Sequence, residues 1–304
     1  MSRAEDPGGR SRNTRFASSA KRSAFLMTLP MYLFTLVFVL GPLVYMLVLS
    51  FLRRGDVWGV SLSFTLRNYS RIGIPEYART FVQSIRLALF STAAVTLFGY
   101  PFGYFMAKLR PLWRARVMII LIIPFWTSSL MRLYGWIIVF RANGILDRIL
   151  MAAGLTAEPL RLLYTYQAVV TGMIYALLPF MIYSVYTSAE KMDWGLVEAA
   201  RVLGASPAQA FLTVTLPLTM PGLFSGIILT FIPSMGLFFI ADILGGNKVV
   251  LVGNLIQEQL MRAHDWPFAA ALSVVLMLMT TFFIYLYRRL AQATGGSGEI
   301  EGLV

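Results

Sequence analysis

The connection between the fourth and fifth apolar blocks of this chain reads Glu198-Ala199-Ala200-Arg201-Val202-Leu203-Gly204 and, nine residues later, Val214-Thr215-Leu216-Pro217. Its periodicity predicts a helix, a turn and a second helix, because Leu196, Ala200 and Leu203 share one helix face. Ser206-Pro207 is typical of a helix N-cap with proline in the first helical position. Gly204 supplies the backbone freedom that the intervening turn requires. We therefore expect a short, defined helical unit here rather than an irregular loop.

The blocks on either side of this connection are long and apolar enough to cross a membrane. Of the 304 residues, 58% are hydrophobic and 13% are charged, whereas a soluble domain of this size carries about 25% charged residues. A helix needs about 20 apolar residues to cross roughly 30 Å of hydrocarbon. We therefore predict an all-α membrane protein with six transmembrane helices, at 24–52, 81–106, 117–140, 162–186, 218–240 and 268–286.

The charged residues orient the chain and divide it into four parts. The loop Lys108–Arg116 carries four basic residues and no acid, and short basic loops lie on the cytoplasmic side of a membrane. This orientation places both termini in the cytoplasm, although the arginines of the first outer loop weigh against it. The four parts are a disordered basic tail at 1–22, the first span with its outer loop at 23–80, a transmembrane core at 81–290 that contains the connection 190–217, and a flexible tail at 291–304.

The composition excludes several kinds of chemistry. The chain has no cysteine and a single histidine, His264, so neither thiolate catalysis nor a Cys- or His-based metal site is expected. No G-x-x-x-x-G-K-[ST] stretch occurs, so ATP hydrolysis is not expected of this chain. The net charge of +12 comes mostly from Lys and Arg that flank apolar blocks, which is typical of membrane proteins rather than nucleic-acid-binding ones. We predict no enzyme activity, no cofactor and no metal.

The stretch Glu198–Pro217 resembles the EAA signature, E-A-A-x3-G-x9-(I/V)-x-L-P, of ABC importer permeases with the type I (MetI-like) fold. In that family this cytoplasmic loop is a coupling helix, which docks on a separate ATP-hydrolysing subunit. The resemblance implies that the contact with the ATPase is made by Glu198, Ala199, Ala200, Gly204 and Pro217. The alternative is an ordinary amphipathic loop helix, in which Glu198 is only a solvated charge.

Other segments extend the resemblance over about Leu29 to Arg289, toward the B-type permease subunit of spermidine/putrescine importers. The similar segments are 124–136, 231–240, 242–247, 253–256 and 265–268. The resemblance implies one half of a translocation pathway in the bacterial inner membrane. It also implies a heterodimer with a second, C-type permease, two copies of the ATPase and a periplasmic binding protein. Two alternatives stay open: the same fold importing another small solute, and an ATP-independent secondary transporter or channel.

A pathway for a polycation needs carboxylates, carbonyl dipoles or aromatic faces. The candidates are Asp242, near the outer end of the fifth span, and Trp126 and Tyr134 in the third. Asp242 could instead cap a helix or pair with an arginine, and the two aromatic residues could be packing or belt residues. Arg132 would repel a cation, so we interpret it as a structural partner of a carboxylate or of carbonyl groups. Asp265, in the last outer connection, is expected to be a solvated charge.

Overall fold

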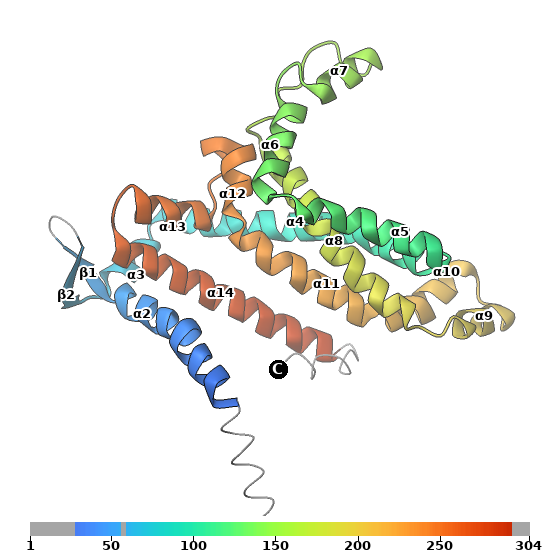
Figure 1. Cartoon of the computed structure of the whole chain (residues 1–304), viewed down its shortest axis with the longest axis horizontal. Coiled ribbons are helices and arrows are strands. Elements are labelled where there is room, and N and C mark those ends of the chain that lie inside the picture. Colours follow the sequence, from blue (N-terminus) through green and yellow to red (C-terminus); the bar gives the residue numbers. More distant parts are fainter. Residues whose placement is uncertain (1–27, 56–58, 294–304) are drawn as a thin grey trace, which may run out of the picture.

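The computed structural model describes residues 28–55 and 59–293 (Figure 1). The predicted basic tail at 1–22 lies outside the described residues, as does the predicted C-terminal tail from residue 294 onward. The first residues assigned to that tail, 291–293, instead belong to the last helix, α14 (Trp266–Ala293).

The described chain is mostly helical, as predicted. Among the described residues, five helical stretches are long and apolar enough to cross a membrane, and one bent pair of helices makes a sixth when the pair is counted as one span. One of them, α4, has 33 residues and at about 1.5 Å per residue extends roughly 50 Å, well beyond ~30 Å of hydrocarbon. The five stretches are Thr28–Ser50, which contains η1 (Thr35–Leu40) and α2 (Gly41–Ser50); α4 (Pro75–Ala107); α8 (Tyr166–Glu190); Pro207–Gly236, which joins α10 (Pro207–Ala210), η3 (Phe211–Thr215) and α11 (Leu216–Gly236); and Trp266–Arg289 in α14.

The predicted third span is wrong as a continuous helix. It consists of α5 (Pro111–Ile122) with a 3-10 turn, η2 (Ile123–Trp126), followed by α6 (Ser129–Phe140). The stretch Pro111–Trp126 is bent by 96° from the stretch Ser129–Ala152. Pro124 has no N–H to continue the helical ladder, and Thr127 is extended with φ −94° and ψ 151°. As a result, α6 and the following α7 (Ile145–Ala152) stand out from the bundle (Figure 1).

The connections are also more structured than predicted. The outer loop expected over 53–80 contains an antiparallel pair of strands and α3, and α4 begins within it at Pro75. The fifth span begins at Pro207 rather than at Leu218, because the second helix of the connection runs directly into it. The remaining elements are β1 (Leu52–Arg54), β2 (Val60–Phe64), α3 (Arg67–Ile72), α9 (Gly195–Val202), α12 (Phe238–Ile240), η4 (Ala241–Gly245), η5 (Gly246–Lys248) and α13 (Val252–Met261).

Helices α4, α8 and α11 form the centre of the bundle and approach each other closely at glycines. A Cβ atom on Gly103 of α4 would lie 2.7 Å from the carbonyl oxygen of Ile182 in α8. A Cβ atom on Gly222 of α11 would lie 2.6 Å from the carbonyl oxygen of Ser184, also in α8. Small residues allow such close backbone contact between membrane helices, where van der Waals packing drives association.

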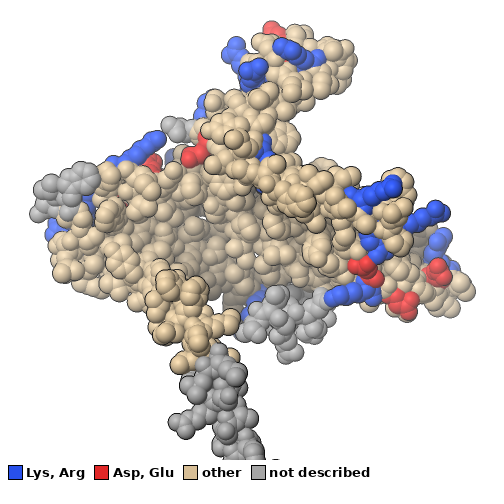
Figure 2. Space-filling view, viewed as in Figure 1, with Lys and Arg blue, Asp and Glu red and all other residues tan. Residues whose placement is uncertain are grey.

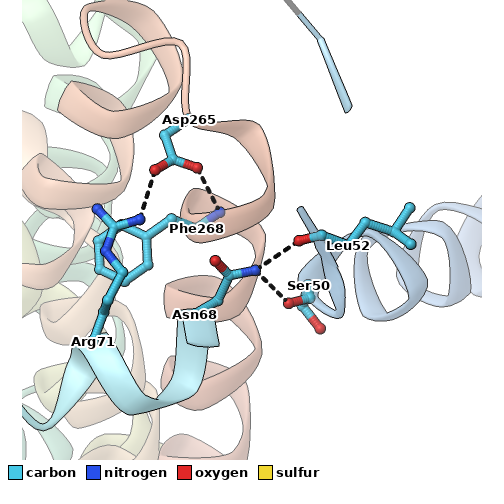
Figure 3. A network of polar contacts seen from close by, with 6 residues as sticks. All are labelled: Ser50, Leu52, Asn68, Arg71, Asp265 and Phe268. Carbon is cyan, nitrogen blue, oxygen red and sulfur yellow. Dashed lines mark hydrogen bonds and ion pairs between the residues drawn. The ribbon is translucent and has the colours of Figure 1, made fainter. Parts of the chain in front are cut away.

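The first span, by contrast, touches the bundle mainly at its outer end. Within η1 and α2 only Ser50 is buried. There the side-chain amide of Asn68, in α3, donates to the carbonyl oxygens of Ser50 and Leu52 at 2.9 Å each (Figure 3). The bond to Ser50 satisfies a carbonyl group that the end of α2 leaves without a partner, and the bond to Leu52 ties α3 to β1.

The same short helix α3 also holds the start of α14. Arg71 donates to Asp265 Oδ2 at 2.7 Å, and its guanidinium lies 3.8 Å from the centre of the Phe268 ring (Figure 3). Asp265 also accepts from the backbone N–H of Phe268 at 3.2 Å. The expectation that Asp265 is a solvated charge is therefore wrong: its side chain is 5% exposed. Burial of a carboxylate is tolerated here because it is paired and hydrogen-bonded.

Candidate functional site

The connection that contains Glu198–Gly204 folds into two helices joined by a tight turn at one end of the bundle. The first helix, α9, ends at Val202 with Leu203 as its C-cap, and Gly204 follows with φ +94°. The N–H of Ala205 donates to the carbonyl of Ala200 at 3.0 Å, and that of Gly204 donates to the carbonyl of Arg201 at 3.1 Å. This pair of bonds is a Schellman motif, whose left-handed residue is usually glycine. The prediction that Gly204 supplies the backbone freedom of the turn is confirmed.

The second helix of the connection begins as predicted. Ser206 is its N-cap, and Pro207 occupies the first helical position. The N–H of Gln209 donates to Ser206 Oγ at 3.3 Å, and the N–H of Ser206 donates to Gln209 Oε1 at 2.8 Å. This reciprocal capping box satisfies two N–H groups that the helix start would otherwise leave unpaired. Both ends of the turn are thus fixed by local hydrogen bonds, which makes the connection a defined surface.

The outward side of this connection is apolar. Val202 and Leu203 are each 87% exposed, and Leu196 is 48% exposed. Leu196 and Leu203, which were predicted to share one helix face with Ala200, are therefore not packed on the bundle. Helix α9 ends at Val202, and Leu203 is its C-cap. Glu198 and Ala199 are exposed and Ala200 is half-buried. Exposed apolar side chains grouped around one charge are typical of a surface that binds another protein.

Near this connection an ion pair joins helix α5 to helix α8, and the sequence alone did not indicate it. Arg114, at the start of α5, pairs with Glu190, the last residue of α8. Arg114 also donates to the carbonyl oxygen of Ala107 at 3.3 Å. The partners lie 76 positions apart, so helical periodicity carries no sign of the pairing. Figure 2 shows Lys and Arg gathered over this end of the bundle and over α7, with a largely uncharged surface between them.

Asp242 lies at the opposite end of α11, in η4, and is exposed. Its Oδ1 accepts from the side-chain amide of Asn254 at 2.8 Å. The two residues line a cavity of about 120 Å³ that also contains Glu258, Gln257 and Arg262. The cavity therefore offers two carboxylates and two amides, groups that can bind an amine, alongside one guanidinium.

Trp126 and Tyr134 lie on the two sides of the break in the third span. They are 84% and 57% exposed, and neither lines the cavity that contains Asp242. Thr127, between them, has extended backbone. Such irregular backbone at membrane depth is tolerated only where protein or a water-filled cavity covers it.

Arg132 stabilises this break. Its guanidinium donates to the carbonyl oxygen of Pro124 and lies 5.0 Å from the centre of the Phe125 ring. The prediction that Arg132 is a structural partner of carbonyl groups is confirmed. Arg132 and Phe125 line a mostly apolar cavity of about 250 Å³ between α6, α8 and α11. Among the residues that the structure describes, no group of three or more His, Asp or Glu side chains could hold a metal ion.

Comparison with known proteins agrees with this arrangement. The family described as "Binding-protein-dependent transport system inner membrane component" matches residues 99–296. The spermidine/putrescine transport system permease protein PotB of Escherichia coli (strain K12) is 41% identical over 264 residues, covering 87% of this chain and 96% of that protein. The protein of the same name from Haemophilus influenzae is 40% identical, covering 87% of this chain and 92% of that protein.

The fold is also similar to solved structures. One chain of a bacterial alginate ABC transporter, solved with an alginate pentasaccharide-bound periplasmic protein, has a TM-score of 0.73 at 15% identity. That match covers 92% of this chain and 98% of the other. One chain of the MetNI methionine ABC transporter, in an inward-facing conformation, has a TM-score of 0.53 at 20% identity and covers 71% of this chain and 95% of the other. The chain therefore belongs to the family of binding-protein-dependent transport system inner membrane components, which are transport proteins of the inner membrane.

Proposed function

We propose that this chain is the membrane-spanning permease subunit of an ATP-driven importer of polyamines such as spermidine and putrescine. The observation that carries the proposal is the connection at 195–210. Its turn is fixed by a Schellman motif and a capping box, and it exposes apolar side chains at one end of the bundle. The names of the relatives that are about 40% identical supply the substrate class.

The connection is the contact with a separate ATPase subunit. Exposed Glu198 offers a charge for a basic group of the ATPase, and the small side chains of Ala199 and Ala200 permit close approach. Gly204 holds the turn in the conformation that presents them. Pro217 is the second residue of α11, the helix that follows directly after the π-helical turn η3. Because the connection continues into α11, a shift of the loop can tilt that membrane helix as a lever.

The substrate passes between this chain and a second permease. Asp242 is the first carboxylate that an incoming polyamine meets, and its cavity supplies further acceptors from Glu258 and Asn254. Trp126 and Tyr134 then offer aromatic faces for cation–π contact. The exposed, irregular backbone between them supports this role, since it requires a covering partner or water.

This chain supplies one coupling connection and one half of the translocation pathway, so other subunits must supply the rest. The complex contains a second, C-type permease as a heterodimer partner, two copies of the ATPase and a periplasmic binding protein that delivers the polyamine. The connection at 195–210 must face the ATPase, so both termini lie in the cytoplasm. The Asp242 cavity then opens toward the periplasm, where the binding protein docks.

Two measurements test this proposal. A tagged chain expressed with its partners should retain an ATPase subunit through purification in detergent, whereas an independent channel would purify without one. In cells that depend on this importer, Asp242→Asn should reduce uptake of radiolabelled spermidine. Glu158→Gln, at an exposed acid outside the Asp242 cavity, is the matched control. Uptake by Asp242→Asn equal to that of the control would remove Asp242 from the pathway, and a tagged chain that purified without an ATPase subunit would contradict the coupling role.

A further inference from the structure

The outer part of α4 and the start of α8 form a basic groove that the proposed pathway does not use. The groove has a volume of about 780 Å³, and its lining includes Arg79, Gln83 and Arg86 of α4 and Tyr166, the first residue of α8. Arg79 and Arg86 are seven positions apart, which places both on one face of the helix. No carboxylate is among the described residues that line the groove, so the two guanidinium groups share this face without a counter-charge.

Arg79 and Arg86 also differ from Arg71, the arginine of α3. Arg71 pairs with Asp265 at 2.7 Å, whereas Arg79 and Arg86 form no ion pair and no hydrogen bond with any residue that the structure describes. An arginine side chain carries five N–H donors and a permanent charge. An ionisable residue on a membrane helix calls for a partner, and here that partner must come from outside the described chain.

The position of the groove along α4 corresponds to the headgroup level of a membrane. Lys108 is the C-cap of α4 and begins the basic loop that is predicted to be cytoplasmic. At about 1.5 Å per residue, the helix rises roughly 32 Å from Ala107 to Arg86, close to the ~30 Å of hydrocarbon. Arg86 therefore lies at the far boundary of the hydrocarbon, and Arg79 lies roughly 10 Å beyond it. The layer that holds the headgroup phosphates lies between the levels of these two arginines.

Towards the middle of the membrane, the face of α4 that carries Arg86 continues as an exposed apolar stripe. We define this stripe as Leu89, Ala93 and Leu97, which follow Arg86 at intervals of three or four residues. Ala93 is exposed, and Leu89 and Leu97 are 53% and 68% exposed. The stripe extends roughly 16 Å from Arg86 into the hydrocarbon. Two cations joined to such a stripe match a molecule with a phosphate at one end and acyl chains at the other, whereas a free anion has no part that contacts the stripe.

We propose that the basic groove binds an anionic phospholipid, with its phosphate held by Arg79 and Arg86 and an acyl chain lying along the apolar stripe. The planar guanidinium of arginine matches two phosphate oxygens at once. Tyr166 stands beside the groove with its ring 6.5 Å from the ring of Phe90, and tyrosine is typical of the membrane interface. None of the residues that line the groove lines the Asp242 cavity, so the lipid site is separate from the proposed substrate pathway.

The proposed orientation of the chain places this lipid in the outer leaflet. The arginines of the outer segment weigh against that orientation, and a bound anionic headgroup offsets two positive charges on that side of the membrane. Only the choice of leaflet rests on the proposed function. The lipid site itself follows from the charges, the spacing and the exposure of residues on α4.

Quenching by brominated lipids tests the site at one defined position. The chain has no cysteine, so Ala93→Cys attaches a single bimane fluorophore to the apolar stripe, in an assembled complex whose partner subunits have been freed of cysteine. The complex is placed in phosphatidylcholine nanodiscs that also contain brominated phosphatidylglycerol or, in a parallel sample, brominated phosphatidylcholine. The two quenching curves give the relative affinity of the two lipids beside Ala93. Both leaflets have the same composition, so the result does not depend on the orientation of the chain.

We expect phosphatidylglycerol to be preferred roughly 30-fold, because each arginine near an anionic headgroup raises the affinity roughly fivefold. Arg86→Gln should lower this preference roughly fivefold, and the combination of Arg79→Gln with Arg86→Gln should abolish it. The matched control combines Arg53→Gln with Arg54→Gln, which removes two exposed arginines of β1, at the same end of the bundle but outside the groove (Figure 1). The control should keep the full preference.

Equal affinity for the two lipids in the unaltered complex would overturn the proposal, as would an equal loss of preference in the control. Quenching by neither lipid would show that another protein subunit covers this face of α4. Loss of the preference on addition of millimolar inorganic phosphate would assign the groove to a free anion instead. Either of these two results would also overturn the lipid site.

Two further measurements keep the outcome clear. If the double substitution in the groove prevents assembly, the unaltered complex and Arg86→Lys decide the question: lysine keeps the charge but not the planar fork, so the preference should fall less than in Arg86→Gln, and an equal fall would contradict binding by charge. Spermidine uptake and retention of the ATPase are measured on the same unaltered complex. Their absence would refute the proposed function without affecting the lipid preference.

Discussion

Replacing Gly204 by alanine should weaken binding of the ATPase without unfolding the membrane core. Gly204 has φ +94°, and a Cβ atom placed there would meet nothing within 4 Å. The cost is therefore a backbone cost alone, roughly 1–2 kcal/mol for a residue with a Cβ in left-handed conformation. Since 1.4 kcal/mol is a factor of ten, the closed turn becomes about 5- to 30-fold less populated relative to its alternatives.

The affinity for the ATPase depends on the fraction of molecules in which the turn has the conformation that binds it. If the ATPase binds only the conformation closed by the Schellman motif, the apparent dissociation constant rises by up to the same factor. Titration of the purified ATPase against the permease complex in nanodiscs measures it. Gly204→Asn should show a smaller loss, because asparagine tolerates left-handed backbone better than alanine does.

Gly59 provides a closely matched control in the same chain. Its φ is +90°, and a Cβ atom there would also meet open space, but Gly59 lies beside β2 at the other end of the bundle. Gly59→Ala should carry a similar backbone cost and leave ATPase affinity unchanged. Equal affinities for Gly204→Ala and Gly59→Ala would refute the argument that this turn presents the docking surface.

Three further substitutions test contacts within the bundle by melting in detergent. Asp265→Ala should lower the free energy of unfolding by about 2 kcal/mol, below the ~3–5 kcal/mol of a fully buried pair, because the Arg71 side chain is 31% exposed; an unchanged melting temperature would contradict this. Arg132→Leu uncaps the carbonyl at the break in the third span and should cost about 1–3 kcal/mol, with Arg132→Lys less affected; a stable leucine variant would show that the cap is dispensable. Gly103→Ala forces a Cβ to within 2.7 Å of a backbone oxygen in α8 and should cost about 1–3 kcal/mol, whereas Gly135→Ala, with open space, should be tolerated; equal melting of the two would argue against tight packing at Gly103.

The connection at 195–210 was largely predictable because its structure is local. A Schellman turn and a capping box join residues three to five positions apart, so the residue types at Gly204, Ser206 and Pro207 carry their own signal. The helix itself is one residue shorter than the shared face of Leu196, Ala200 and Leu203 implied, because Leu203 is the C-cap of α9. The ring of Trp194 lies 5.8 Å from the ring of Tyr104, and the position of Trp194 shortly before Glu198 in the sequence does not indicate this contact.

The sequence alone is sufficient to predict a bundle of membrane helices and a capped helical turn in one connection. Both features depend on residues that are neighbours in the chain: a run of apolar residues crosses the hydrocarbon, and a few adjacent residues close the turn. The break in the third span, the ion pair of Arg71 with Asp265 and the ring contact of Tyr104 with Trp194 required the folded chain. Arg71 and Asp265 lie 194 positions apart, and lipid-facing and protein-facing sides of a membrane helix are both apolar. Periodicity therefore cannot indicate which sides meet, and only the three-dimensional packing decides it.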